Sequence, residues 1–334
     1  MRSWRTPAPG VVVTGADREL GARLLARLTQ TGRPATGLAS SAQWTAGALA
    51  GAGVVVHLAA SRDPDEPAAR RSRETVDGTS TLLVAAREAG VRRVVLVTSA
   101  EVLLARPGQV PAPERGPLRT IDDDSLVSDW LEVERLADHA RRTGLVVVVL
   151  RPATLTGLGP TGDGAVLRQL AAPRLLAVRG IEPLWQLCHA DDLVTALDLA
   201  VAARWRGPCV VACDGWLTQS QVERLSGRRR LELPAAVALS TAERLHRLGV
   251  STGAPSELDS LLAPVVVESL RMRAAGWTPT WTNEGALVAH LEATGTSAAR
   301  TDRGAAYAAG AAGATAAVVG TAALVRRARR RRRR

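Results

Sequence analysis

The stretch VVVTGADRELG, residues 11–21, joins a run of β-branched residues to a glycine turn and then to a helical pattern. The segment 10–15 is typical of a buried strand that ends in a glycine. Across 18–32, leucines recur on one helical stripe, at positions 20, 24, 25 and 28. A strand, a glycine turn and a helix in direct succession predict the first unit of an α/β fold.

The same alternation continues along the first half of the chain. Val-rich runs predict strands at 53–60, 91–100 and 145–152, and the segment PATGL (34–38) predicts a weaker one. Helical patterns lie between the strands at 68–90 and 122–144. The run LVVVVLRP is apolar on both faces, which favours a parallel sheet covered by helices on both sides. The second half is more mixed, with predicted helices at 191–201, 217–227 and 282–295 and a strand at 209–215.

Composition restricts the chemistry open to the chain. Among 334 residues there is one Tyr, there is no Phe, and every one of the 43 basic residues is Arg. No mechanism can therefore use a lysine. Eight of these Arg lie in 326–334, and removing their charge from the net +11 leaves +3 for residues 1–325. A general nucleic-acid-binding face is not indicated for the body, so only the Arg tail is a candidate for such contacts.

The three cysteines, Cys188, Cys209 and Cys213, are too few for a disulfide framework and have no His or Cys cluster to complete a zinc site. We expect them to be buried thiols. The first ten residues, MRSWRTPAPG, contain no apolar run of signal-peptide length. The body is therefore expected to be cytoplasmic.

Six segments, in order and spacing, resemble the extended branch of the short-chain dehydrogenase/reductase (SDR) superfamily, the NAD-dependent epimerase/dehydratase-like proteins. They are TGADRELG, VVVHLAA, TVDGTSTLLVAAREAGVRRVVLVTSAEV, LRPATLTGLG, CHADDLVTALDLA and MRAAGWTPTWT. The resemblance covers about residues 10–293. It implies a Rossmann-type doubly wound parallel sheet within 8–300, with a small C-terminal α+β substrate lobe built from segments after about 155, and a separate tail at 301–334.

The resemblance implies a binding site for NAD or NADP, but the glycine turn departs from the family pattern. Gly15 and Gly21 fit the first and third glycines, while Arg18, or Glu19 in the alternative spacing, stands where the second glycine lets the backbone approach the pyrophosphate. Arg18 could reach a phosphate oxygen, whereas Glu19 would repel it unless turned away. The segment 37–44 also lacks the acid that usually binds the ribose. Binding could lean towards NADP, be weak, or be lost.

The cofactor-binding residues that the resemblance implies are Gly15, Arg18, Glu19, Leu20, Gly21, Leu58, Ala59, Ala60, Thr98 and Pro152.

The family's catalytic residues are mostly missing. Ser99 matches the family Ser, but the alignment places Leu126 at the Tyr position and Trp130 at the Lys position. Asp129, Glu101 or Asp122–Asp124 could substitute as an acid or base. The alternative is that Asp122–Asp124 start a helix, that Asp129 and Glu132 lie on a solvated face, and that Ser99 satisfies a backbone group. In CHADDL, the aspartates after His189 are expected to cap a helix, without a metal.

The C-terminal tail predicts contact with an anionic surface. Residues 305–325 are uncharged, and as a helix they would reach about 30 Å, enough to span a bilayer. Eleven of the 21 are Ala, and eight Arg follow at once. Three interpretations stay open: an Ala/Gly-rich membrane-spanning helix, a helix lying on anionic lipid, and a disordered tail that binds a polyanion.

Two functions are therefore compatible with the sequence. The first is a catalytically degenerate family member that binds a nucleotide or small molecule at the membrane. The second is an NAD(P)-dependent oxidoreductase or epimerase that acts on a nucleotide sugar or a similar carbonyl or hydroxyl compound with a non-standard acid/base. Either could form a homo-oligomer, and fold alone does not decide between them.

Overall fold

A parallel six-stranded sheet forms the centre of the computed structural model, which describes residues 10–41, 43–63, 66–105, 109–159, 164–238, 240, 244, 256 and 265–295. The strand order is β10-β5-β4-β3-β1-β2, and every neighbouring pair is parallel. The strands are β1 (Gly10–Thr14), β2 (Ala35–Leu38), β3 (Ala52–His57), β4 (Arg93–Val97), β5 (Val146–Pro152) and β10 (Gly207–Val211). The predicted α/β class and parallel sheet are confirmed.

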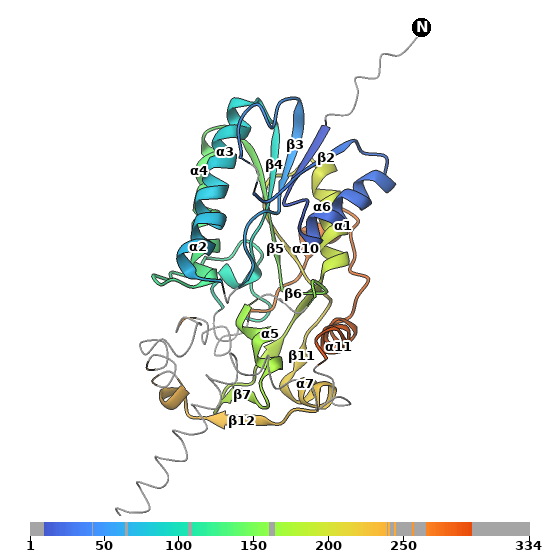
Figure 1. The fold of residues 1–334 in the computed structure, drawn as a ribbon. Coiled ribbons are helices and arrows are strands. Elements are labelled where there is room, and N and C mark those ends of the chain that lie inside the picture. The colour runs from blue at the N-terminus through green and yellow to red at the C-terminus, as the bar shows by residue number, and fades with distance from the viewer. Residues whose placement is uncertain are drawn as a thin grey trace, which may run out of the picture.

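Helices cover both faces of this sheet (Figure 1). Helices α1 (Glu19–Gln30) and α6 (Ala190–Ala202) lie on one face, and α3 (Gly78–Glu88) and α4 (Leu126–Arg142) lie on the other. In β5, Val148 and Leu150 pack towards α1 and α6, while Val147 and Val149 pack towards α3 and α4. This alternation explains why residues 146–150 of the strand are apolar on both faces.

Two predicted helices have different boundaries in the structure. The segment 68–90 contains α2 (Ala68–Ser72), a π-helical turn (Arg73–Asp77) and α3. Helix α4 starts at Leu126, because the Ser125 hydroxyl accepts a hydrogen bond from the Ser128 amide, 3.1 Å away, and caps it. Asp122–Asp124 therefore precede the helix instead of forming its first turn.

A smaller α+β lobe lies at the lower end of the sheet in Figure 1. Three two-stranded sheets form it: β6 (Thr154–Thr156) with β9 (Leu187–His189), β7 (Leu175–Val178) with β12 (Arg230–Leu233), and β8 (Leu184–Trp185) with β11 (Leu217–Thr218). Its helices are α5 (Gly164–Ala171), α7 (Gln219–Ser226) and α11 (Asn283–Ala293), while α10 (Leu270–Ala274) packs beside β10. Helix α7 begins and ends as predicted, with a capping box at Thr218 and a left-handed Gly227.

The three cysteines are buried, as predicted. Burial raises the pKa of Cys209 and of Cys213 to about 12. Among the helices of the described ranges, none combines the length and hydropathy that a membrane span requires. The predicted tail helix at 305–325 and the Arg run lie outside the described residues.

Candidate functional site

The glycine turn after β1 is packed tightly against the segment that follows β3. Gly15 adopts a φ of +70°, and a Cβ there would lie 2.6 Å from the carbonyl oxygen of Leu58 and 2.8 Å from the amide nitrogen of Ala59. A Cβ on Gly21 would lie 2.1 Å from the carbonyl oxygen of Gly15. Only glycine fits at either position, so the turn brings β1, α1 and residues 57–60 together.

Arg18 stands at the entrance of α1 and reaches across this turn. Its Nη1 donates to the carbonyl of Ala60 at 3.0 Å, and its Nη2 lies 2.9 Å from Oε2 of Glu74. The first amides of any helix have no acceptor within the helix. Arg18 is the N-cap residue of α1, and its side chain accepts no hydrogen bond from these amides, so they stay available to a ligand. A guanidinium and a helix N-terminus thus lie together where an anion would be stabilised.

Glu19 is turned away from that anion-binding turn. Its carboxylate pairs with Arg23, which also donates to the carbonyl of Gly157 at 2.8 Å and to Asp191 at 2.8 Å. The Glu19 carboxylate is therefore ion-paired within its own helix, through a guanidinium that it shares with Asp191.

A carboxylate that the sequence did not indicate lies at the end of β2. The Oδ1 and Oδ2 atoms of Asp17 accept hydrogen bonds from the amide and hydroxyl of Ser40, at 2.6 and 2.7 Å. These bonds hold the pKa of Asp17 below its usual value. A carboxylate from the glycine turn thus lies beside the segment 37–44, which has no acid of its own. Asp17 and Ser40 are 23 residues apart in the sequence. Their proximity becomes visible only once β1 and β2 are known to pair in parallel.

His57 is a buried packing residue at the end of β3. Its Nδ1 lies 2.7 Å from the Thr14 hydroxyl, and its ring packs edge-on against Trp44. Complete burial lowers the pKa of His57 to about 4, so the ring is neutral at physiological pH.

Ser99 caps a short 3₁₀ turn, η2 (Ala100–Val102), through a 3.2 Å hydrogen bond from the Glu101 amide. The neighbouring Thr98 hydroxyl donates to Glu134 at 2.9 Å, and Glu134 forms a two-point ion pair with Arg151. Ser99 and Glu101 are both buried. The end of β4 is therefore held by structural hydrogen bonds, and the Ser99 hydroxyl accepts one of them.

Leu126 and Trp130, aligned with the family Tyr and Lys, are buried and apolar. The guanidinium carbon of Arg62 lies 5.0 Å from the centre of the Trp130 ring, within cation–π range. Arg62 also donates to the carbonyl of Thr98 at 3.0 Å. A permanent cation thus covers Trp130, the residue that the alignment places at the family Lys position. Arg62 lies far from 122–144 in the sequence, so nothing in the sequence indicated this contact.

Asp129 corrects an expectation. It is 7% exposed and forms a 2.8 Å ion pair with Arg71 of α2, so it lies on no solvated face. Burial raises the pKa of Asp129 even though Arg71 opposes this. Glu132, on the outer side of α4, does pair with Arg135 at the surface.

The CHADDL turn is also built differently from the prediction. The ring of His189 caps α6 by accepting from the Asp191 amide at 3.3 Å, and it stacks on Trp281. Asp192 binds the amides of Thr280 and Trp281 and so joins the turn to the segment before α11. Within the described residues no cluster suited to a metal occurs.

The predicted cofactor residues lie along the carboxyl edge of the sheet. Gly15, Arg18 and residues 58–60 are in direct contact, and Arg62 links them to Thr98. The Thr98 amide in turn binds the end of β5, near Pro152. Leu20 is the exception, because its side chain is buried in the core between α1 and the sheet.

The sheet, the tight glycine turn and the covering helices define a Rossmann-type protein of the extended SDR kind. The family model of the NAD-dependent epimerase/dehydratase family matches residues 11–210. The chain belongs to this family.

Relatives and solved structures agree with this assignment. An uncharacterized protein of Mycobacterium tuberculosis is 31% identical over 236 residues, which cover 68% of this chain and 62% of that protein. The chain thus spans under two thirds of that relative's length. A Streptomyces protein named 3-diazoavenalumate denitrifying reductase is 33% identical over 248 residues, 68% of this chain and 75% of its own. The Thermus thermophilus UDP-glucose 4-epimerase, solved with NAD, superposes with a TM-score of 0.62 at 18% identity, over 85% of this chain and 98% of that one.

Proposed function

We propose that the chain binds NAD at the carboxyl edge of its sheet but lacks the proton transfer on which its family usually depends. The burial of Leu126 and Trp130 carries this proposal. A phenol at the first position and an amine at the second would transfer and tune a proton, whereas leucine and the indole ring offer no titratable group. The single tyrosine, Tyr307, lies outside the described residues.

The residues present fit a dinucleotide. The first turn of α1 and the Arg18 guanidinium would hold the pyrophosphate, once Arg18 leaves Glu74 or shares its donors. Asp17, at the end of β2, would accept a ribose hydroxyl and would repel a 2′-phosphate, which favours NAD over NADP. When bound, the nicotinamide supplies or accepts a hydride.

A second candidate is hydride reduction of a substrate that takes its proton from water. The reductase named among the relatives, at 33% identity, favours it. Arg62 would stabilise negative charge that develops on a carbonyl or similar group. Because a guanidinium stays protonated at neutral pH, Arg62 could not relay a proton. Nucleotide sugars and other carbonyl compounds are the substrate classes to test.

Titration of the full chain with NADH and NADPH tests the first proposal. We expect NADH to bind with a Kd below about 100 µM, measured by calorimetry. We also expect no turnover of nucleotide sugars. NADH absorbance would report their reduction, and chromatography of the sugars would report epimerisation or dehydration, which leave net NADH unchanged. Absence of binding would contradict NAD recognition. Turnover that falls in Arg62→Gln while NADH affinity is unchanged would favour the second candidate.

We further propose that residues 305–334 direct the protein to an anionic membrane, with the Arg run on the lipid headgroups. Each Arg near such a surface contributes about 1 kcal/mol. A variant that ends at residue 300 should move from the membrane fraction to the soluble fraction. Identical fractionation of the two chains would contradict the proposal.

A further inference from the structure

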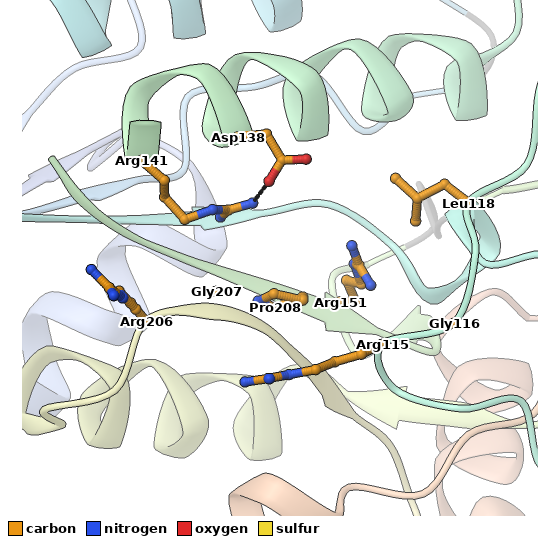
Figure 2. A pocket seen from close by; sticks show the side chains of 9 residues that line it. All are labelled: Arg115, Gly116, Leu118, Asp138, Arg141, Arg151, Arg206, Gly207 and Pro208. Atoms are coloured by element: carbon orange, nitrogen blue, oxygen red, sulfur yellow. Dashed lines mark hydrogen bonds and ion pairs between the residues drawn. The ribbon is translucent and has the colours of Figure 1, made fainter. Parts of the chain in front are cut away.

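A cavity of about 440 Å³ lies on the α4 side of the sheet, at its β10 edge. Side chains on this face alternate along β5, so Arg151 follows Val147 and Val149 towards α4. Pro208 pairs with Val149 and faces the same way. The cavity is lined by Arg115, Gly116, Leu118, Asp138, Arg141, Arg151, Arg206, Gly207 and Pro208, as Figure 2 shows.

Four guanidiniums surround this cavity, and only two are neutralised. Arg151 is paired with Glu134 through two bonds of 2.8 and 2.9 Å, and Arg141 is paired with Asp138. Among the described residues, Arg115 and Arg206 form no hydrogen bond or ion pair. Glu114, beside Arg115, is bound to the Val210 amide at 2.8 Å and does not line the cavity. The cavity wall therefore carries more positive than negative charge, even though the Glu114 carboxylate interacts electrostatically with Arg115 from outside the cavity.

One donor of the cluster is buried without an acceptor. The Nη1 atom of Arg141 is inaccessible to solvent and has no hydrogen-bond partner, while its other terminal nitrogen binds Asp138. A buried donor of this kind is costly unless a ligand or water satisfies it. Figure 2 shows Arg141 directed over the space that Arg115, Arg151 and Arg206 also border. The cavity is thus bordered by arginines from four separate segments of the chain.

We propose that this cavity binds the phosphate group of a small phosphorylated molecule. A phosphate monoester carries nearly two negative charges at neutral pH and has three acceptor oxygens. The positive charge of the wall favours an anion of this kind, and guanidinium forks suit phosphate oxygens. The cavity volume lies within the range of small-ligand sites. Its lining includes no residue of the glycine turn or of residues 57–60, so the site is separate from the proposed NAD site.

Site-resolved chemical protection in the full chain tests the proposal. Phenylglyoxal modifies accessible guanidiniums, and peptide mass spectrometry reports each arginine separately from the Arg tail. Inorganic phosphate, compared with chloride at equal ionic strength, should slow the modification of Arg115 and Arg206 at least fivefold. Arg92 and Arg204, which are exposed and outside the cavity, should react at unchanged rates. The proposal would be overturned if phosphate protected Arg92 and Arg204 as strongly as Arg115 and Arg206, or if it protected none of these four residues.

A matched pair of variants sharpens the test. Arg206→Gln removes a cavity charge, while Arg204→Gln removes an exposed charge two residues away. Phosphate should no longer protect Arg115 in Arg206→Gln but should still do so in Arg204→Gln. NADH affinity should be the same in both variants, which separates this proposal from the NAD site. Retained protection of Arg115 in Arg206→Gln would mean that no joint phosphate site exists.

Discussion

Asp17 shows how a single carboxylate can reach a site from an unexpected element. The turn after β1 carries it, yet its two hydrogen bonds to Ser40 place it at the end of β2. A carboxylate at this edge favours the hydroxyls of an NAD ribose and opposes the phosphate of NADP. Charge at residue 17 should therefore set which nucleotide binds.

Replacement of Asp17 by Ser tests this directly. Loss of the negative charge should lower the preference for NADH over NADPH by about tenfold, which corresponds to about 1.4 kcal/mol. Calorimetric Kd values for both nucleotides measure the ratio. Asp77→Ser, which removes an exposed carboxylate from the turn before α3, is the control and should leave the ratio unchanged. An unchanged ratio in Asp17→Ser would mean that the ribose is recognised elsewhere.

At the scale of single residues, the sequence predicted where glycine is required but not which partners the charged side chains contact. Gly15 and Gly21 are recognisable because backbone geometry demands glycine there. The partners of Arg18, Asp17 and Asp129 are not, because each contact joins residues far apart in sequence: Arg18 with Glu74, Asp17 with Ser40, and Asp129 with Arg71. Periodicity carries no information on such pairs.

Among the elements, α4 is attached to α2 by a buried ion pair. Arg71 and Asp129 are 3% and 7% exposed, and Arg71 also donates to the carbonyl of Asp124, just before α4. Each charge depends on the other, because neither has water to replace its partner. The pair therefore fixes the start of α4, where Leu126 and Trp130 lie.

Removing one partner of the Arg71–Asp129 ion pair should lower the free energy of unfolding more than removing both partners. Asp129→Leu alone leaves the Arg71 charge buried and should destabilise the protein by about 3–5 kcal/mol. The double variant Arg71→Met/Asp129→Leu should recover most of that loss. Urea unfolding, with Glu132→Leu on the exposed side of α4 as the control, measures the difference. If the double variant were as unstable as the sum of the single ones, the two residues would not be coupled.

Element types could be predicted well, and boundaries less well. The Val-rich strands are unmistakable because both of their faces are buried. The π-helical turn at Arg73–Asp77 was missed, since the residues 68–90 have one continuous helical pattern. The start of α4 was placed too early because three acids favour a helix N-terminus in general, while here the Ser125 hydroxyl provides the cap.

For the whole molecule, buried histidines should make stability depend on pH. Burial lowers the pKa of His57 to about 4 and lowers the pKa values of His189 and His290 in the same direction. The unfolded chain, with an ordinary pKa near 6.5, binds protons that the native state excludes. The stability that comes from keeping these histidines neutral is fully present above about pH 6.5 and is lost as the pH falls towards 4.

The His57→Asn variant isolates the largest contribution. Asn can still accept from the Thr14 hydroxyl, but it does not titrate. Between pH 7 and pH 4.5, its free energy of unfolding should fall by about 2–3 kcal/mol less than that of the wild type. Urea denaturation at the two pH values measures this. Equal losses in the two proteins would mean that His57 is protonated in the native state at the lower pH.

The three buried cysteines have a practical consequence for spectroscopy. With every native thiol enclosed, and with two of them protonated well beyond neutral pH, a maleimide dye should react at a cysteine newly introduced on the surface and spare the native ones. The absence of lysine removes the usual competing amine. Fluorophores attached beside Arg18 and beside Arg206 could then report ligand binding at the two proposed sites without replacement of the native cysteines.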